Sequence, residues 1–199
     1  MSDLQEPRRR QRADARRSIA AVLDAAVALL GGKPDASMDE IAVAAGVSRQ
    51  TIYAHYSSRD ALLHAVTRHI TAEVAVKLSG LDLDSGSAVE ALGRWIGASW
   101  TLLERYPVLL TPAIVTPDGD EQERHEPVTG GLIRLLERGR HGREFDPAMP
   151  TTWYLAAIIG LGHAASQEVL AGRMTPDEAG AAFRESAIKI CRATDAPAR

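Results

Sequence analysis

The chain has 199 residues, of which 45% are apolar and 25% charged, and its formal net charge is −3. This length allows one domain or two small ones, and the apolar content is ample for a buried core, which excludes an intrinsically disordered chain. The single cysteine, Cys191, excludes an intramolecular disulfide and fits a reducing compartment.

No apolar segment follows the arginine-rich N-terminus, so a secretory leader is not indicated. The longest apolar run, near residues 154–162, is well short of a membrane span. We therefore expect a cytoplasmic protein with no membrane partner.

Residues 1–12, MSDLQEPRRRQR, hold four arginines and a proline and almost nothing to bury. We expect a disordered basic arm, which either lies along nucleic-acid phosphates or in a minor groove, or remains a solvated tail. From residue 13 to about 30, apolar side chains recur at helical spacing and predict one amphipathic helix. The glycines and the proline of residues 31–34 end it.

Residues 37–62 have the pattern of a helix-turn-helix followed by the start of a further helix. Ser37 and Glu40 form a capping box, so a helix is expected to begin at Met38. Gly46 tolerates the left-handed backbone at which that helix must end. A tight turn into a second helix is therefore expected after it.

The second helix is expected from Arg49 to Tyr56, because Ser48 is a good N-cap. In such a unit the second helix enters the major groove of DNA, and its first residues meet base edges. Arg49 and Gln50 carry donors that match guanine and adenine edges, respectively. Hydroxyl or ring N–H groups that can reach phosphates are carried by Thr51, Tyr53, His55 and Tyr56.

A further helix is expected to begin after Ser57 or Ser58, with Arg59 in its first turn, where free amides and a cation favour a phosphate. Taken singly, each of these polar residues fits a solvated helix surface better than a DNA contact. Their combination in this order is what points to DNA. Charge agrees, since residues 1–68 hold ten Lys and Arg against eight acids, and the remainder thirteen against eighteen.

Over about residues 14–70 the chain resembles the DNA-binding domain of the tetracycline-repressor (TetR) family of bacterial transcription regulators. The shared pattern is a small residue, an Ile-Ala pair, a Gly-Val-Ser turn, a Thr-hydrophobic-Tyr run, a His-aromatic pair and a basic residue. Here these are Ser37, Ile41-Ala42, Gly46-Val47-Ser48, Thr51-Ile52-Tyr53, His55-Tyr56 and Arg59. Gln50 departs from the family's frequent glycine, which is expected to alter base preference. Arg59 replaces the commoner lysine and keeps the charge that would grip a phosphate.

A fourth helix is expected over about residues 59–80, and the resemblance implies that it carries ligand-induced motion to the DNA-reading heads. Residues 81–87 are rich in Asp, Gly and Ser and read as a linker. The expected organisation is thus an arm at 1–12, a DNA-binding domain with its connecting helix at 13–80, and a helical effector-binding and dimerisation domain at 81–199.

Within the second domain, helices are expected over about residues 89–106 and 128–140. Residues 116–127 are acidic and broken by Pro and Gly, so an exposed loop or gate is expected there. Residues 151–170 are apolar around most of a helix and must be covered on both sides. A capping box, Thr175 with Glu178, starts the last helix.

The last two helices of two chains are expected to form a four-helix homodimer interface, unless they belong to the core of a monomer. Such a dimer is also what the resemblance implies, and its symmetry predicts a palindromic operator in double-stranded DNA.

Aromatic and small polar residues of the second domain suit a pocket for a mostly apolar small molecule, although an aromatic at helical spacing is more often core. The candidate effector-binding residues are Trp95, Ser99, Trp100, Tyr106, Trp153, Tyr154 and His163.

Signals for catalysis are weak. Residues 160–165 fit the dinucleotide fingerprint G-x-G-x-x-A, but no strand precedes them, and close helix packing explains the glycines better. His64 and His69 do not share a helix face well enough for a zinc site. We expect no catalytic residue, cofactor or metal, and read Cys191 as a packing residue.

The sequence therefore predicts an all-α, two-domain homodimer that regulates transcription and that a small-molecule effector releases from its operator. The alternative is an all-α ligand-binding or enzymatic bundle that no longer reads DNA. The joint presence of Thr51, Tyr53, His55 and Arg59 argues against that alternative.

Overall fold

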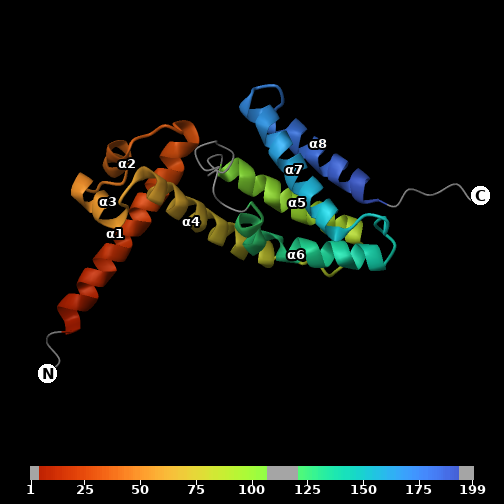
Figure 1. Cartoon of the computed structure of the whole chain (residues 1–199), viewed down its shortest axis with the longest axis horizontal. Coiled ribbons are helices and arrows are strands. Elements are labelled where there is room, and N and C mark those ends of the chain that lie inside the picture. The colour runs from red at the N-terminus through yellow and green to blue at the C-terminus, as the bar shows by residue number, and fades with distance from the viewer. Residues whose placement is uncertain (1–4, 107–120, 193–199) are drawn as a thin grey trace, which may run out of the picture. The chain divides into compact units, whose positions relative to one another are not determined.

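The computed structural model describes residues 5–106 and 121–192, and these residues form eight helices with one isolated β-bridge between Phe145 and Arg192. The expected all-α fold class is confirmed. Figure 1 shows the helices in chain order. They are α1 (Gln5–Gly32), α2 (Met38–Ala44), α3 (Arg49–His55), α4 (Arg59–Ser79), α5 (Ala88–Arg105), α6 (Glu121–His141), α7 (Thr151–Leu170) and α8 (Pro176–Cys191).

The described residues group into two units. The first comprises residues 5–70 with Tyr106, and the second comprises residues 71–105 and 121–192. Within the described ranges, no helix combines the length and the apolar character that crossing a bilayer requires.

Helix α1 corrects the expectation of a disordered arm over residues 1–12, because it begins at Gln5. Gln, Glu and Arg, which make up most of residues 5–12, are good helix formers. Pro7 lies in the first turn, where its missing N–H breaks no helical hydrogen bond. Residues 1–4 of the expected arm lie outside the described residues.

The first unit is built around the helix-turn-helix, and its local signals act as the sequence predicts. Ser37 Oγ accepts from the Glu40 amide at 3.3 Å while the Ser37 amide donates to Glu40 Oε2 at 2.9 Å, which starts α2. Gly46 adopts a φ of 67° after α2. The shared core of α1 to α4 consists of fully buried side chains, including Val22, Leu30, Ile41, Ile52, Leu62 and Val66.

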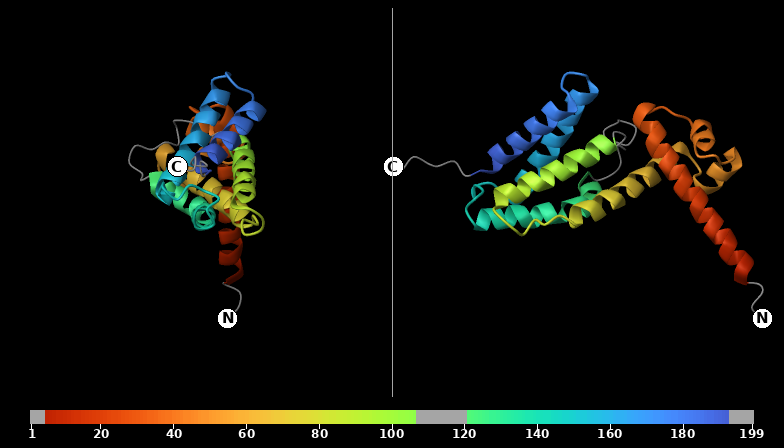
Figure 2. Two further views of the ribbon diagram at one scale, coloured as in Figure 1. Left: turned by 90° about the vertical axis from the view of Figure 1, so that its right-hand side faces the viewer. Right: turned by 180° about the vertical axis from the view of Figure 1, so that it is seen from behind.

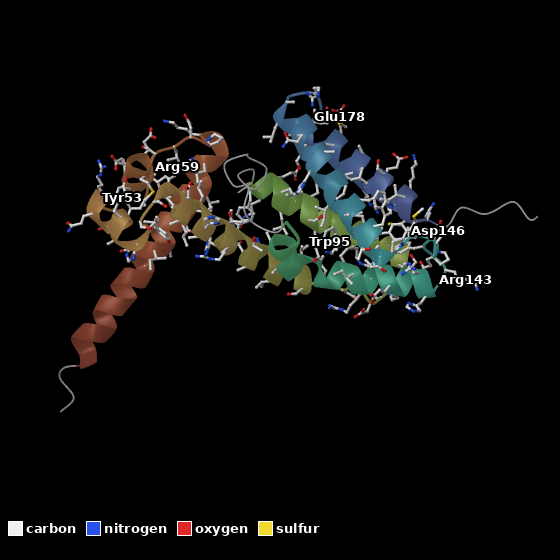
Figure 3. The ribbon with its side chains drawn as sticks, viewed as in Figure 1. Tyr53, Arg59, Trp95, Arg143, Asp146 and Glu178 are labelled. Carbon is white, nitrogen blue, oxygen red and sulfur yellow. The ribbon has the colours of Figure 1, made fainter. Side chains whose placement is uncertain are left out.

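The second unit contains the helical bundle, in which α7 and α8 lie side by side and antiparallel (Figure 2). The capping box of Thr175 and Glu178 starts α8 as predicted, at the end of the bundle where Figure 3 labels Glu178. A Cβ at Gly162 would lie 3.3 Å from the Phe183 ring, so close helix packing accounts for this glycine of the fingerprint.

The two units divide inside α4, between Ile70 and Thr71, rather than at residues 81–87. Those residues belong to the second unit, where two arginines bind their carbonyls. Arg94 Nε donates to Asp82 O at 3.0 Å, and Arg138 Nη2 donates to Leu83 O at 2.9 Å. A segment whose composition indicates a linker is thus bound to α5 and α6.

Helix α6 begins at Glu121, which corrects the expectation of an exposed loop through residue 127. Acidic side chains stabilise the first turns of a helix through its dipole, and Glu and Gln have high helix propensity. Residues 116–120 of the expected loop lie outside the described residues.

The packing of Phe145 against α6 can be tested by substituting a glycine of that helix. The buried ring of Phe145 occupies the place that a Cβ at Gly139 would take. We expect Gly139→Ala to lower the free energy of unfolding by about 1–3 kcal/mol through overpacking. Gly97→Ala is the matched control, because that helical glycine faces open space. It is expected to raise stability by about 0.5–1 kcal/mol. Thermal unfolding followed by circular dichroism measures both, and equal shifts for the two variants would contradict the packing argument.

Candidate nucleic-acid interface

The candidate recognition helix, α3, is short and is fixed at both ends. Ser48 Oγ accepts from the Thr51 amide at 3.1 Å and lies 2.8 Å from Thr51 Oγ1, so both hydroxyls shape the entry to the helix. At its end, the Tyr56 amide donates to Ile52 O at 2.9 Å. Ile52 is fully buried and anchors the inner face.

Opposite Ile52, α3 presents an outward face. Arg49, Gln50, Tyr53 and His55 are exposed, and Thr51 is partly exposed. Tyr53 is 42% exposed although it is a large aromatic residue, and Figure 3 labels it on α3. Amide, guanidinium and hydroxyl groups therefore lie together on one surface, as reading base edges and phosphates requires.

Arg49 is held in place by two neighbours on this surface. Its Nη1 lies 2.8 Å from Asp39 Oδ2, and its Cζ lies 5.4 Å from the centroid of the Tyr53 ring. Asp39, in the first turn of α2, is a residue that the sequence analysis missed. Its carboxylate and the Tyr53 ring limit the directions in which the guanidinium can point.

Arg59, expected to meet a phosphate, makes hydrogen bonds inside the protein. Its Nε donates to Ala36 O at 3.2 Å, and its Nη2 donates to Pro34 O at 2.5 Å. These hydrogen bonds tie the start of α4 to the connection between α1 and α2, and the contact of Arg59 with a phosphate stays a prediction. Tyr56, another predicted contact, is 9% exposed, and its backbone amide closes α3.

The same connection is fixed from α2. Lys33 Nζ lies 2.5 Å from Glu40 Oε1, while Glu40 Oε2 accepts from Ser37. The hydrogen bond from Lys33, followed by those from Ser37, lowers the pKa of Glu40 to about 2. The carboxylate thus stays ionised at neutral pH. Ser37 serves this junction as the cap of α2.

The predicted effector residues differ in their surroundings. The Trp100 ring lies 6.3 Å from that of Phe183, Tyr154 donates to Asp146 O at 2.9 Å, and Trp153 is 59% exposed. Ser99 Oγ donates to Ile96 O on its own helix, Tyr106 is buried, and His163 is partly exposed.

Trp95 alone among these predicted residues lines a cavity of about 290 Å³ within the second unit. The cavity lies between the end of α4, residues 81–84, α5 and α6. The other walls of the cavity were not predicted from the sequence and come from Ala75, Leu78, Ser79, Leu81, Leu83, Asp84, Val128, Gly130, Gly131, Arg134 and Leu135.

Among the described residues, no group of three or more His, Cys, Asp or Glu side chains is placed to hold a metal ion. Cys191 is fully buried, and this burial raises the pKa of its thiol to about 12. A thiol in that state is a poor nucleophile.

The match to a known protein family lies within the first unit. A family model described as "Bacterial regulatory proteins, tetR family" matches residues 22–66. The HTH-type transcriptional repressor LfrR of Mycolicibacterium smegmatis is 36% identical over 90 residues, 45% of this chain and 46% of that protein. The matched stretch thus spans about half the length of this relative.

Solved structures extend the likeness to the whole fold. The crystal structure of LfrR in complex with proflavine has a TM-score of 0.67 and 25% identity, and covers 89% of this chain and 99% of that one. FadR of Bacillus subtilis, solved in complex with stearoyl-CoA, has a TM-score of 0.64 at 18% identity, covering 86% and 96%. At 18% identity, the similarity to FadR shows only a shared fold. Residues 22–66 therefore match the DNA-binding domain of the tetR family, and the fold of the chain is similar to that of a TetR-like regulator.

Proposed function

We propose that the protein is a homodimeric regulator of transcription that represses from a palindromic operator and leaves it when a small molecule binds the second unit. The outward face of α3 carries this proposal, since Arg49, Gln50 and Tyr53 lie together opposite the buried Ile52. The name of LfrR as a repressor supports repression over activation. Its complex with proflavine supports a small-molecule effector.

Exposed apolar side chains support a dimer through α7 and α8. Trp153 is 59% exposed, Leu170 51% and Ile190 40%. A second copy of the same two helices would cover these side chains, and symmetry would then repeat each contact.

Selection from random duplex DNA at about 150 mM salt tests the function, because non-specific phosphate attraction is weak there. We expect an enriched palindrome. Gln50→Ala should change the preferred base at one position of each half-site, at a cost of about 1–3 kcal/mol for the original site. Tyr53→Phe removes the hydroxyl that we expect to reach a phosphate, so it should instead weaken all sites alike. If Gln50→Ala left the preference unchanged, α3 would not be the reading helix.

Asp39 offers a test of how Arg49 is positioned. Asp39→Asn keeps the side chain's size and removes its charge, so Arg49 loses its ion pair. We expect the preference for the base that Arg49 reads to fall by up to about fivefold, as for other exposed ion pairs. In an Arg49→Ala background the same change should leave base preference untouched. An equal loss of preference in both backgrounds would show that Asp39 acts without Arg49.

The dimer is tested by equilibrium sedimentation at micromolar concentration. We expect the dimer mass for the unaltered protein and a shift towards monomer for Trp153→Glu with Ile190→Glu, because each charge would be buried without a partner. Val76→Glu is the control, since this side chain is 72% exposed and belongs to α4, which is not part of the proposed interface. The monomer mass for the unaltered protein would refute the dimer.

A further inference from the structure

The first half of α1 extends beyond the helix-turn-helix, as the red part of the ribbon shows in Figures 1 and 2. Helix α1 has 28 residues. Its buried residues Val22, Leu23, Ala26 and Leu30 belong to the second half, which packs in the core of the first unit. At 1.5 Å per residue, positions 5–16 add about 18 Å of helix in front of that core.

This extension carries the basic excess of the first unit. Residues 1–17 hold six arginines against three acids, whereas residues 18–68 hold four Lys and Arg against five acids. The six are Arg8, Arg9, Arg10, Arg12, Arg16 and Arg17. Charge of one sign concentrated in this way attracts a partner of the opposite charge.

Three of these arginines share one side of α1. Arg8, Arg12 and Arg16 are four residues apart, so the helical period places their positions within an arc of about 80°. Glu6 and Asp14 fall outside this arc. We call positions 8, 12 and 16 the arginine stripe. Like charges four residues apart repel one another in a helix, and a polyanion alongside would relieve that repulsion.

The arginine stripe continues the side of α1 that faces the helix-turn-helix. Leu23, Ala26 and Leu30 fall within the same arc of the helix, and all three are buried in the core that α1 shares with α2, α3 and α4. The stripe is therefore on the side of α1 where the recognition helix lies, and it precedes the packed part along the chain.

We infer that the arginine stripe binds phosphates of the duplex that α3 reads. Duplex DNA presents one negative charge per ~1.7 Å of its axis, so an extension of about 18 Å can run beside about ten phosphates. Guanidinium groups match phosphate oxygens with paired hydrogen bonds. Because phosphates are the same at every base pair, the stripe adds affinity without base preference. The inference rests on the proposed function in taking DNA as the partner.

The salt dependence of DNA binding tests the stripe, with the full chain and two matched variants. Arg8→Gln with Arg12→Gln removes two charges from the stripe, whereas Arg10→Gln with Arg17→Gln removes two from the other side of α1. The two variants have the same net charge, and glutamine has a helix propensity close to that of arginine. Circular dichroism checks that the helix content is kept.

Fluorescence anisotropy then measures the affinity for the selected operator and for an unrelated duplex between about 50 and 200 mM salt. The stripe variant should lower the salt slope by about 1.8 on both duplexes, so that the loss of affinity over this range becomes about twelvefold smaller. The variant of the other side should leave the slope nearly unchanged. Gln50→Ala should instead weaken binding to the operator alone and leave both slopes in place.

Two results overturn the inference: a slope that the stripe variant does not change, or an equal change for both variants, which would show an effect of net charge alone. The two duplexes separate this outcome from the proposed function. An enriched palindrome without a stripe effect leaves the proposed function standing and overturns the stripe. A stripe effect on the unrelated duplex, with no palindrome enriched, overturns the proposed function and leaves the stripe as a phosphate-binding surface.

Discussion

The position of the recognition helix depends on the short connection between α1 and α2, which is held from both sides. From α4, Arg59 donates to the carbonyls of Pro34 and Ala36. From α2, Glu40 accepts from the Ser37 amide. Because α3 follows α2 after a single tight turn, fixing the start of α2 also fixes where α3 points. The guanidinium of Arg59 therefore helps to fix the start of α2 and, through it, the direction of α3.

The helix starts of the first unit could be predicted because their causes are local. Ser37 and Glu40 are three residues apart, so the sequence alone shows the capping box. Arg59 and the carbonyls it binds are 25 and 23 positions apart. Only the fold, which places the start of α4 beside the connection between α1 and α2, brings these groups together, so sequence spacing could not predict the hydrogen bonds. The pairing of Arg49 with Asp39 across the turn was missed for the same reason.

In the second unit, amino-acid composition predicted the structure less well, because it does not show which residues far apart in the sequence form hydrogen bonds. Residues 81–87 have the Asp, Gly and Ser content of a linker, yet their carbonyls are bound by Arg94 and Arg138. Trp95 and Tyr154 are equally good pocket candidates by residue type. Their hydrogen bonds separate them, since Tyr154 is satisfied by Asp146 O and Trp95 Nε1 has no partner.

Along the chain, helix α4 links the helix-turn-helix to the cavity of the second unit. Its first residue, Arg59, holds the connection before α2, and its last turns, with Leu78, line the cavity. An α-helix transmits displacement along its axis because hydrogen bonds link each turn to the next. We propose that a ligand that shifts Leu78 acts through α4 on the hydrogen bonds of Arg59; DNA binding would then act on the ligand to the same extent. Such coupling needs no contact between ligand and α3. It needs α4 to remain helical between Ile70 and Thr71, where the two units divide.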